Sequence, residues 1–133
     1  MGLSQRNRLG KQPSAWLVWP AQMLPYTDTR VQSTCDWLFA NLQQVVSGSV
    51  GQSAYDGKTT LALARAWQND PAKLAALRSA FATFTHDLPT LGTNHVGEFY
   101  ELDPATKRWK NVNDVPHVWE HMLLYHTAIS LYP

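Results

Sequence analysis

The first residues that could do chemistry are two histidines four positions apart, His117 and His121, with Glu120 between them. On a helix, side chains at positions i and i+4 lie on the same face, so both imidazoles could bind one zinc ion. A catalytic zinc site needs a third protein ligand, and no acidic residue follows Glu120. The third ligand would have to come from upstream, from Glu98 or Glu101.

The order of these residues, His-x-x-Glu-His, is that of the inverted zinc peptidases. The alternative is that His117, at the start of a predicted helix, caps the helix or packs locally. The missing downstream ligand favours this alternative. We therefore expect no metal and no cofactor, and keep zinc at His117 and His121 as a further hypothesis.

A second candidate is Glu98, which follows Gly97 in a segment without helical periodicity. A glycine lets backbone or ligand approach closely, and a carboxylate held beside it can act as a general base. The alternative interpretation is an ordinary solvated acid in a loop. Composition alone favours the solvated acid.

Aromatic residues form a third candidate group, since the chain has six tryptophans and five tyrosines. Their flat apolar faces and polar edges suit stacking against sugar rings. Tyr100 and Trp109 in the irregular segment, and Tyr55 just before a helix, are the candidate ligand contacts. Trp37 and Trp67 lie within helical patterns, so we predict that both pack in the core.

Apolar periodicity predicts helices that would position these residues. Asp28 and Asp70 are predicted N-caps, and Pro71 occupies a first helical position. A short link between the second and third helices indicates an antiparallel hairpin. The expected helices cover residues 29–46, about 57–67, 71–88 and 116–133, after a short segment containing Trp16, Trp19 and Met23.

In the last of these helices, Val118, Met122, Tyr125 and Ile129 line one face. The region before it, residues 90–113, is the longest irregular stretch, and such loops often carry function. Within it, residues 96–102 could form a short strand, and residues 103–106 a turn.

Composition supports one small globular domain of 133 residues, with 44% apolar residues, 16% charged residues and a net charge of +1. The near-neutral charge disfavours nucleic acid as a partner, and no apolar run is long enough to span a membrane. The low charged share indicates that other protein covers part of the surface. Cys35 stands alone and is expected to be a buried thiol.

The first fourteen residues are expected to form a flexible tail, and residues 15–133 a single helical domain. The start is basic, but the apolar stretch that follows is short and stops at Pro20, unlike a signal peptide. The compartment stays open.

Eight short segments, taken in order, together resemble one known family: residues 16–20, 24–25, 28–31, 54–55, 58, 61–64, 92–98 and 115–125. The last two are the most specific. The segments resemble the C-terminal part of glycoside hydrolase family 15, the glucoamylase-like enzymes with an (α/α)6 barrel. The resemblance spans about residues 15–133.

The resemblance implies roles for single residues. Glu98 takes the place of the general base that activates water in inverting hydrolysis. The general acid of the family comes from a segment upstream of everything present here, so hydrolysis by this chain alone is not expected. His117, Trp119 and Glu120 are given a supporting or binding role by the resemblance. The predicted substrate-binding set is completed by His95 and by the aromatic candidates Tyr55, Tyr100 and Trp109.

The resemblance also implies a partial structure, because about two and a half helical hairpins cannot close a six-hairpin barrel. The fold class is therefore expected to be all-α, with antiparallel helical hairpins in a partial barrel or small bundle. We expect a fragment-like or stand-alone relative of these hydrolases that binds an α-glucan or another saccharide weakly. The alternative is a non-catalytic helical module that pairs with itself or with a partner completing the barrel.

Overall fold

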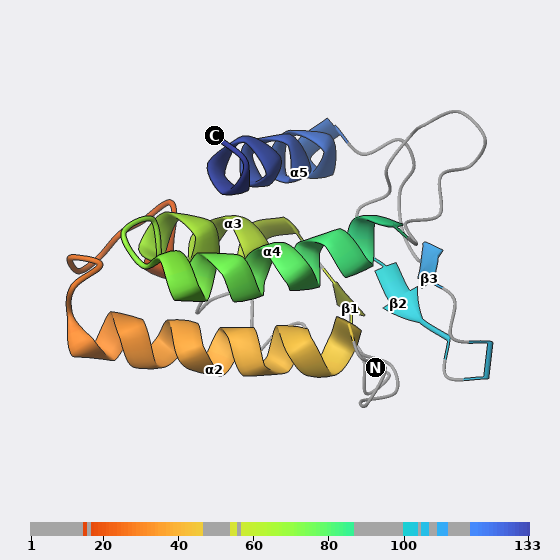
Figure 1. Cartoon of the computed structure of the whole chain (residues 1–133), viewed down its shortest axis with the longest axis horizontal. Helices are drawn as coiled ribbons and strands as arrows, with labels where there is room; N and C mark the ends of the chain where they lie inside the picture. Colours follow the sequence, from red (N-terminus) through yellow and green to blue (C-terminus); the bar gives the residue numbers. More distant parts are fainter. Residues whose placement is uncertain are drawn as a thin grey trace.

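In the computed structural model, the described residues are 15, 17–46, 54–55, 57–86, 100–103, 105–106, 109–111 and 118–133. Four helices in these ranges pack together (Figure 1): α2 (Thr29–Val46), α3 (Gly57–Ala66), α4 (Pro71–His86) and α5 (Val118–Leu131). The predicted all-α class is confirmed. The predicted tail, residues 1–14, lies outside the described residues.

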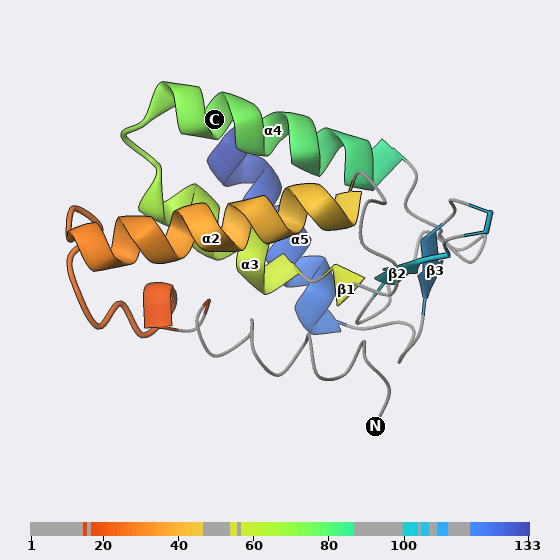
Figure 2. The ribbon, with the colours of Figure 1, turned by 90° about the horizontal axis from the view of Figure 1, so that it is seen from below.

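Helix α3 is the centre of the fold, since it contacts α2, α4 and α5. Figure 1 shows α3 between α2 on one side and α5 on the other, and Figure 2 shows α4 running beside α2. Almost every residue of α3 is buried, including Thr59 and Thr60. A short helix that is buried all round depends on its neighbours for its stability.

The predicted N-caps explain where two of these helices begin. The Lys73 amide donates to Asp70 Oδ1 at 3.0 Å, and Pro71 occupies the first position of α4, as expected. Asp28 caps α2 by accepting from the Arg30 amide at 2.9 Å. Because each carboxylate satisfies an amide without an intrahelical partner, it fixes the start of its helix.

The core between the helices follows the predicted spacing. Buried residues of α2 and α4 recur at steps of three and four, and Trp67 after α3 is 2% exposed, as expected. The ring of Trp67 meets that of Phe39 edge to face, with centroids 5.3 Å apart. The periodic core residues are Val31, Cys35, Leu38 and Leu42 of α2 and Leu74, Leu77, Phe81 and Phe84 of α4.

Trp37 departs from this pattern, and its prediction as a core residue was wrong. Its side chain is 48% exposed. The buried stripe of α2 passes through Cys35 and Leu38, and Trp37 lies off that stripe. A tryptophan within a helical pattern is therefore no guide to burial unless it falls on the stripe itself.

Three short strands form a small antiparallel sheet at one end of the helices (Figure 1): β1 (Ala54–Tyr55), β2 (Tyr100–Leu102) and β3 (Trp109–Asn111). Between β2 and β3, Asp103 Oδ1 accepts from the amides of Ala105 and Thr106. This is the turn predicted for residues 103–106. The sheet joins the segment before α3 to part of the long irregular stretch.

Cys35 is fully buried, as expected, and desolvation by burial raises the pKa of its thiol to about 11. The thiol is therefore protonated at neutral pH.

Among the helices of the described residues, none has the length and apolar character to cross a bilayer.

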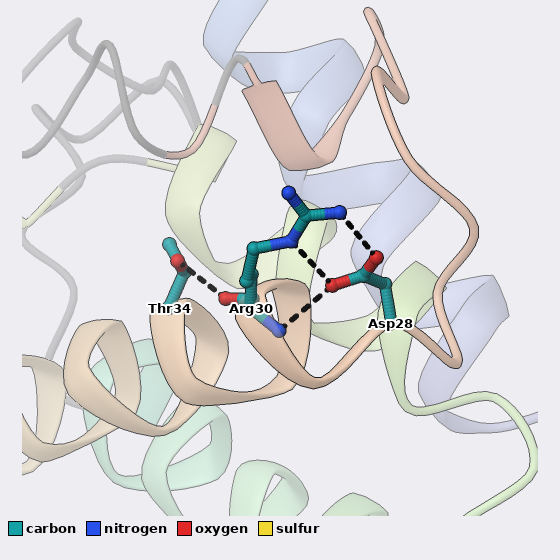
Figure 3. Close-up of polar contacts among 3 residues, drawn as sticks. All are labelled: Asp28, Arg30 and Thr34. Atoms are coloured by element: carbon teal, nitrogen blue, oxygen red, sulfur yellow. Dashed lines mark hydrogen bonds and ion pairs between the residues drawn. The ribbon is translucent and has the colours of Figure 1, made fainter.

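The capping of α2 by Asp28 can be tested through the pKa of the Asp28 carboxyl group. Its carboxylate also accepts from the Arg30 guanidinium, at 3.0 Å from Nε and 2.8 Å from Nη2, while Thr34 Oγ1 donates to the Arg30 carbonyl (Figure 3). The hydrogen bonds from the Arg30 side chain and backbone lower the pKa of Asp28 from 3.8 to about 2. Because the folded-state pKa is depressed, the stabilisation is present above pH 3.8 and is lost as the pH falls toward 2.

We expect Arg30→Ala to raise the pKa of Asp28 toward its ordinary value, as measured by an NMR titration of the Asp28 carboxyl carbon. Thr34→Ala is the matched control, because Thr34 bonds only to the Arg30 carbonyl in this group and should leave the titration unchanged. An Asp28 pKa that stays near 2 in Arg30→Ala would contradict this account.

Candidate functional site

The structure describes the predicted site residues to different extents. Glu98, His95 and His117 lie outside the described residues, so their predicted roles stay predictions. Trp119 and Glu120 are described with their side chains, in the first turn of α5.

The predicted aromatic contacts of the irregular segment lie in the small sheet, where only the backbone is described. Tyr55 of β1 and Tyr100 of β2 are directly paired in the register, and Trp109 of β3 pairs with Leu102. The backbone therefore brings Tyr55 and Tyr100 together from positions far apart in the sequence.

Glu120 is one of the few buried polar residues among those described, and it is 2% exposed. Its Oε1 accepts a hydrogen bond from the Gly57 amide at 2.6 Å. Gly57 is the first residue of α3, where the helix amides lack intrahelical partners and the helix dipole is positive. The carboxylate of one helix thus caps another helix, 63 residues away in the sequence.

Gly57 has no room for a side chain at this contact. A Cβ there would lie 2.6 Å from Glu120 Oε1 and 2.9 Å from the Leu123 Cβ. The absence of a side chain is what lets the first turn of α5 approach the start of α3 so closely. This contact gives Glu120 a structural role between α3 and α5, and the role that the resemblance implies for it stays a prediction.

Beside this contact lies a groove of about 600 Å³ between α3, α5 and the segment before α2. Two tryptophans contribute to its walls, Trp19 and Trp119, and its surface is mostly apolar. A volume of this size is in the range of small-molecule sites, roughly 300–1,000 Å³. The other lining residues are Leu61, Arg65, Val118, Met122, Leu123 and His126.

Polar groups lie in the lining of the groove and beside it. Trp119 is 52% exposed, and Lys58 Nζ lies over its ring, 5.7 Å from the centroid. Arg65 Nε is buried, with no hydrogen-bond partner among the described residues. His126 adds an imidazole on the α5 side. The groove therefore combines aromatic walls with a few hydrogen-bonding groups.

The zinc hypothesis gains no support from the part of the chain that is described. Within these residues, no group of three histidine, cysteine or acidic side chains is placed to hold a metal ion. Glu120, the acid of the His-x-x-Glu-His motif, is buried against Gly57. The other histidine of the motif, His117, lies outside the described residues, so the hypothesis stays untested.

Comparisons with protein-family models, curated proteins and solved structures found no match for this chain. The resemblance to glucoamylase-type hydrolases therefore rests on the sequence segments alone.

The sequence did not indicate Trp19, Lys58 or Arg65 as members of a site. Lys58 and Arg65 are seven residues apart, about two helical turns, which places them along a common side of α3, but this spacing alone suggested no ligand. Trp19 joins the groove from a different segment of the chain. Only the packing of α5 on α3 brings these side chains together.

The contact between Gly57 and Glu120 generates a stability prediction. Glu120→Ala removes a buried carboxylate and leaves the Gly57 amide without this acceptor, so we expect the free energy of unfolding to fall by about 2–4 kcal/mol. Gly57→Ala forces a Cβ against Glu120 and Leu123 and should cost about 1–3 kcal/mol. Urea denaturation followed by circular dichroism measures both.

Asp36→Ala is the matched control, because it removes an exposed carboxylate paired with Lys73 at 2.7 Å. Such a surface pair is worth less than about 1 kcal/mol. Equal stabilities of Glu120→Ala and Asp36→Ala would show that the buried contact does not hold the helices together.

Proposed function

We propose that this chain is a helical relative of the glucoamylase-type hydrolases that binds carbohydrate, and that the groove beside Trp119 is the binding site. The observation that carries the proposal is the pair of tryptophans, Trp19 and Trp119, in the walls of one groove. The apolar face of a pyranose ring stacks on an indole, and its hydroxyl groups need hydrogen-bonding partners at the rim.

Such partners lie in the groove and next to it. Lys58 lies beside Trp119, and Arg65 and His126 lie in the walls. The buried Arg65 Nε, with no acceptor among the described residues, is the kind of donor that a hydroxyl or an ordered water would satisfy after a small shift of the side chain. Stacking would supply most of the affinity, because the lining is mainly apolar.

The proposed class of ligand comes from the resemblance of the sequence segments to the glucoamylase-type enzymes. Residues 92–98 and 115–125 are the pieces that most resemble the glucoamylase-type enzymes, and the second of them includes Trp119 and Glu120. We therefore propose α-glucans such as maltose and longer maltooligosaccharides as ligands.

The proposal is limited to binding. Inverting hydrolysis needs an acid and a base with room for a water between them. By resemblance Glu98 supplies the base, whereas the family's acid comes from a segment upstream, and neither Glu101 nor Glu120 matches it. Glu120 is buried and bonded to Gly57, which removes it from that role. We therefore propose binding without efficient hydrolysis by this chain alone.

Isothermal titration calorimetry with maltoheptaose tests the proposal. We expect weak, millimolar binding by the wild-type chain and at least a tenfold weakening in Trp119→Ala, because the stacking face is lost, equivalent to about 1.4 kcal/mol. Trp37→Ala is the matched control, since Trp37 is exposed to a similar extent but is not among the residues that line the groove. Its affinity should equal that of the wild type.

Two results would contradict the proposal. The first is the absence of heat from the wild-type chain at millimolar maltoheptaose. The second is binding that Trp119→Ala and Trp37→Ala weaken equally, because the groove would then not be the site.

A further inference from the structure

The outward face of α5, continued by Tyr132 directly after the helix, carries a row of large apolar side chains, here called the outer stripe. Its five residues are between 46% and 74% exposed. They follow one another at steps of four, three, four and three residues, which is the spacing of the contact positions in a coiled coil. The outer stripe consists of Val118, Met122, Tyr125, Ile129 and Tyr132.

The sequence correctly placed the first four of these residues on one face, but this is the face turned to solvent. The opposite face of α5 is buried against the rest of the protein through Leu123, Leu124, Thr127 and Leu131. The helix is thus apolar on both sides. A helix of this kind is normally enclosed by protein all round.

Contacts at both ends hold α5 in this orientation. At its start, Glu120 accepts from the Gly57 amide of α3. At its end, Arg78 of α4 donates through Nε to the Leu131 carbonyl at 2.5 Å. These contacts keep the helix from turning its outer stripe inward, so the stripe is presented as a fixed surface.

No lysine, arginine or aspartate occurs in α5, and its one acid, Glu120, is buried on the inner face. Two cations lie at the ends of the stripe: Arg78 is over the Tyr132 ring, 6.0 Å from its centroid, and Lys58 is over the ring of Trp119, beside Val118, at 5.7 Å. The middle of the stripe, around Tyr125, carries no charged side chain of α5, so two copies can meet there without repulsion between like charges. An apolar surface of this kind favours a second copy of this chain over a charged partner.

We propose that the outer stripe pairs with the outer stripe of a second copy, antiparallel about a two-fold axis at Tyr125. In this register Val118 lies opposite Tyr132 of the second copy, and Met122 lies close to Ile129. Val118, the smallest side chain of the stripe, then packs against Tyr132, and the two helix dipoles are antiparallel, which is the favourable arrangement. The surface is self-complementary, as a two-fold interface requires.

The exposed area of the stripe is that of a small specific interface. Fully buried aromatic side chains cover about 150–250 Å² each, and Tyr125 and Tyr132 are more than half exposed. With the three aliphatic residues, each copy offers on the order of 500 Å². The total of about 1,000 Å² reaches the lower bound expected of a specific interface.

This inference does not rest on carbohydrate binding, and the two would compete: Val118 and Met122 belong to both the groove and the outer stripe, so pairing covers part of the groove. Tyr125 belongs only to the stripe. Tyr125→Lys is therefore the variant of choice, because it addresses pairing without altering the lining of the groove.

Sedimentation velocity of the full chain across the micromolar range is the first test. We expect a dimer for the wild type and at least a tenfold increase in the dissociation constant for Tyr125→Lys, which places two ammonium groups at the two-fold axis. Trp37→Lys, at a similarly exposed aromatic on α2, is the control and should still dimerise. Circular dichroism verifies that both variants keep their helices.

Cysteine cross-linking under mild oxidation tests the register. Tyr125→Cys should form a disulfide-linked dimer, because the position meets itself at the axis. Val118→Cys should not link to itself but should link to Tyr132→Cys when the two variants are mixed. The wild type is the control, since its one cysteine, Cys35, is buried.

A wild-type chain that is monomeric throughout the concentration range and a Tyr125→Cys variant that does not cross-link would overturn the proposal. Self-linking of Val118→Cys as efficient as that of Tyr125→Cys would overturn the antiparallel arrangement. An unchanged dissociation constant in a folded Tyr125→Lys would show that another surface forms the dimer.

Discussion

The hydrogen bond from the Gly57 amide to the buried Glu120 carboxylate is the contact on which the rest of this structure depends. It joins the start of α3, the central helix, to the first turn of α5. A buried carboxylate is costly unless its oxygens are satisfied, and the amino end of a helix offers both amide donors and a favourable dipole. Because Gly57 has no side chain, the two elements approach closely enough for this bond to form.

Two surfaces follow from this contact. Trp119, next to Glu120, reaches the groove that it shares with Trp19 of the N-terminal segment. One turn further along, Met122 lies on both the groove and the outer stripe. The rotation of α5 about its axis therefore determines the position of both surfaces. One is the Trp119 face proposed to stack on sugars, and the other is the apolar surface proposed to pair with a second copy.

Much of the fold could be predicted from local signals in the sequence. Asp28, Asp70 and Pro71 mark helix starts because capping depends only on residues within one turn. The apolar steps in α2 and α4 gave the buried stripes for the same reason. The exposure of Trp37 and the outward orientation of the Tyr125 face were not predictable in this way, since α5 is apolar on both sides and periodicity alone does not say which side faces the core. The groove could not be predicted from local sequence signals either, because its walls come from three separate segments of the chain.

Hydrogen exchange of the Gly57 amide, followed by NMR, tests the central contact most directly. A first residue of a helix normally exchanges quickly, because its amide has no partner within the helix. If Glu120 holds this amide in the core, its protection should match that of amides in the middle of α3, such as Leu63, and should report the global free energy of unfolding. Exchange at the rate of an exposed helix end would show that the Glu120 carboxylate does not bind the Gly57 amide.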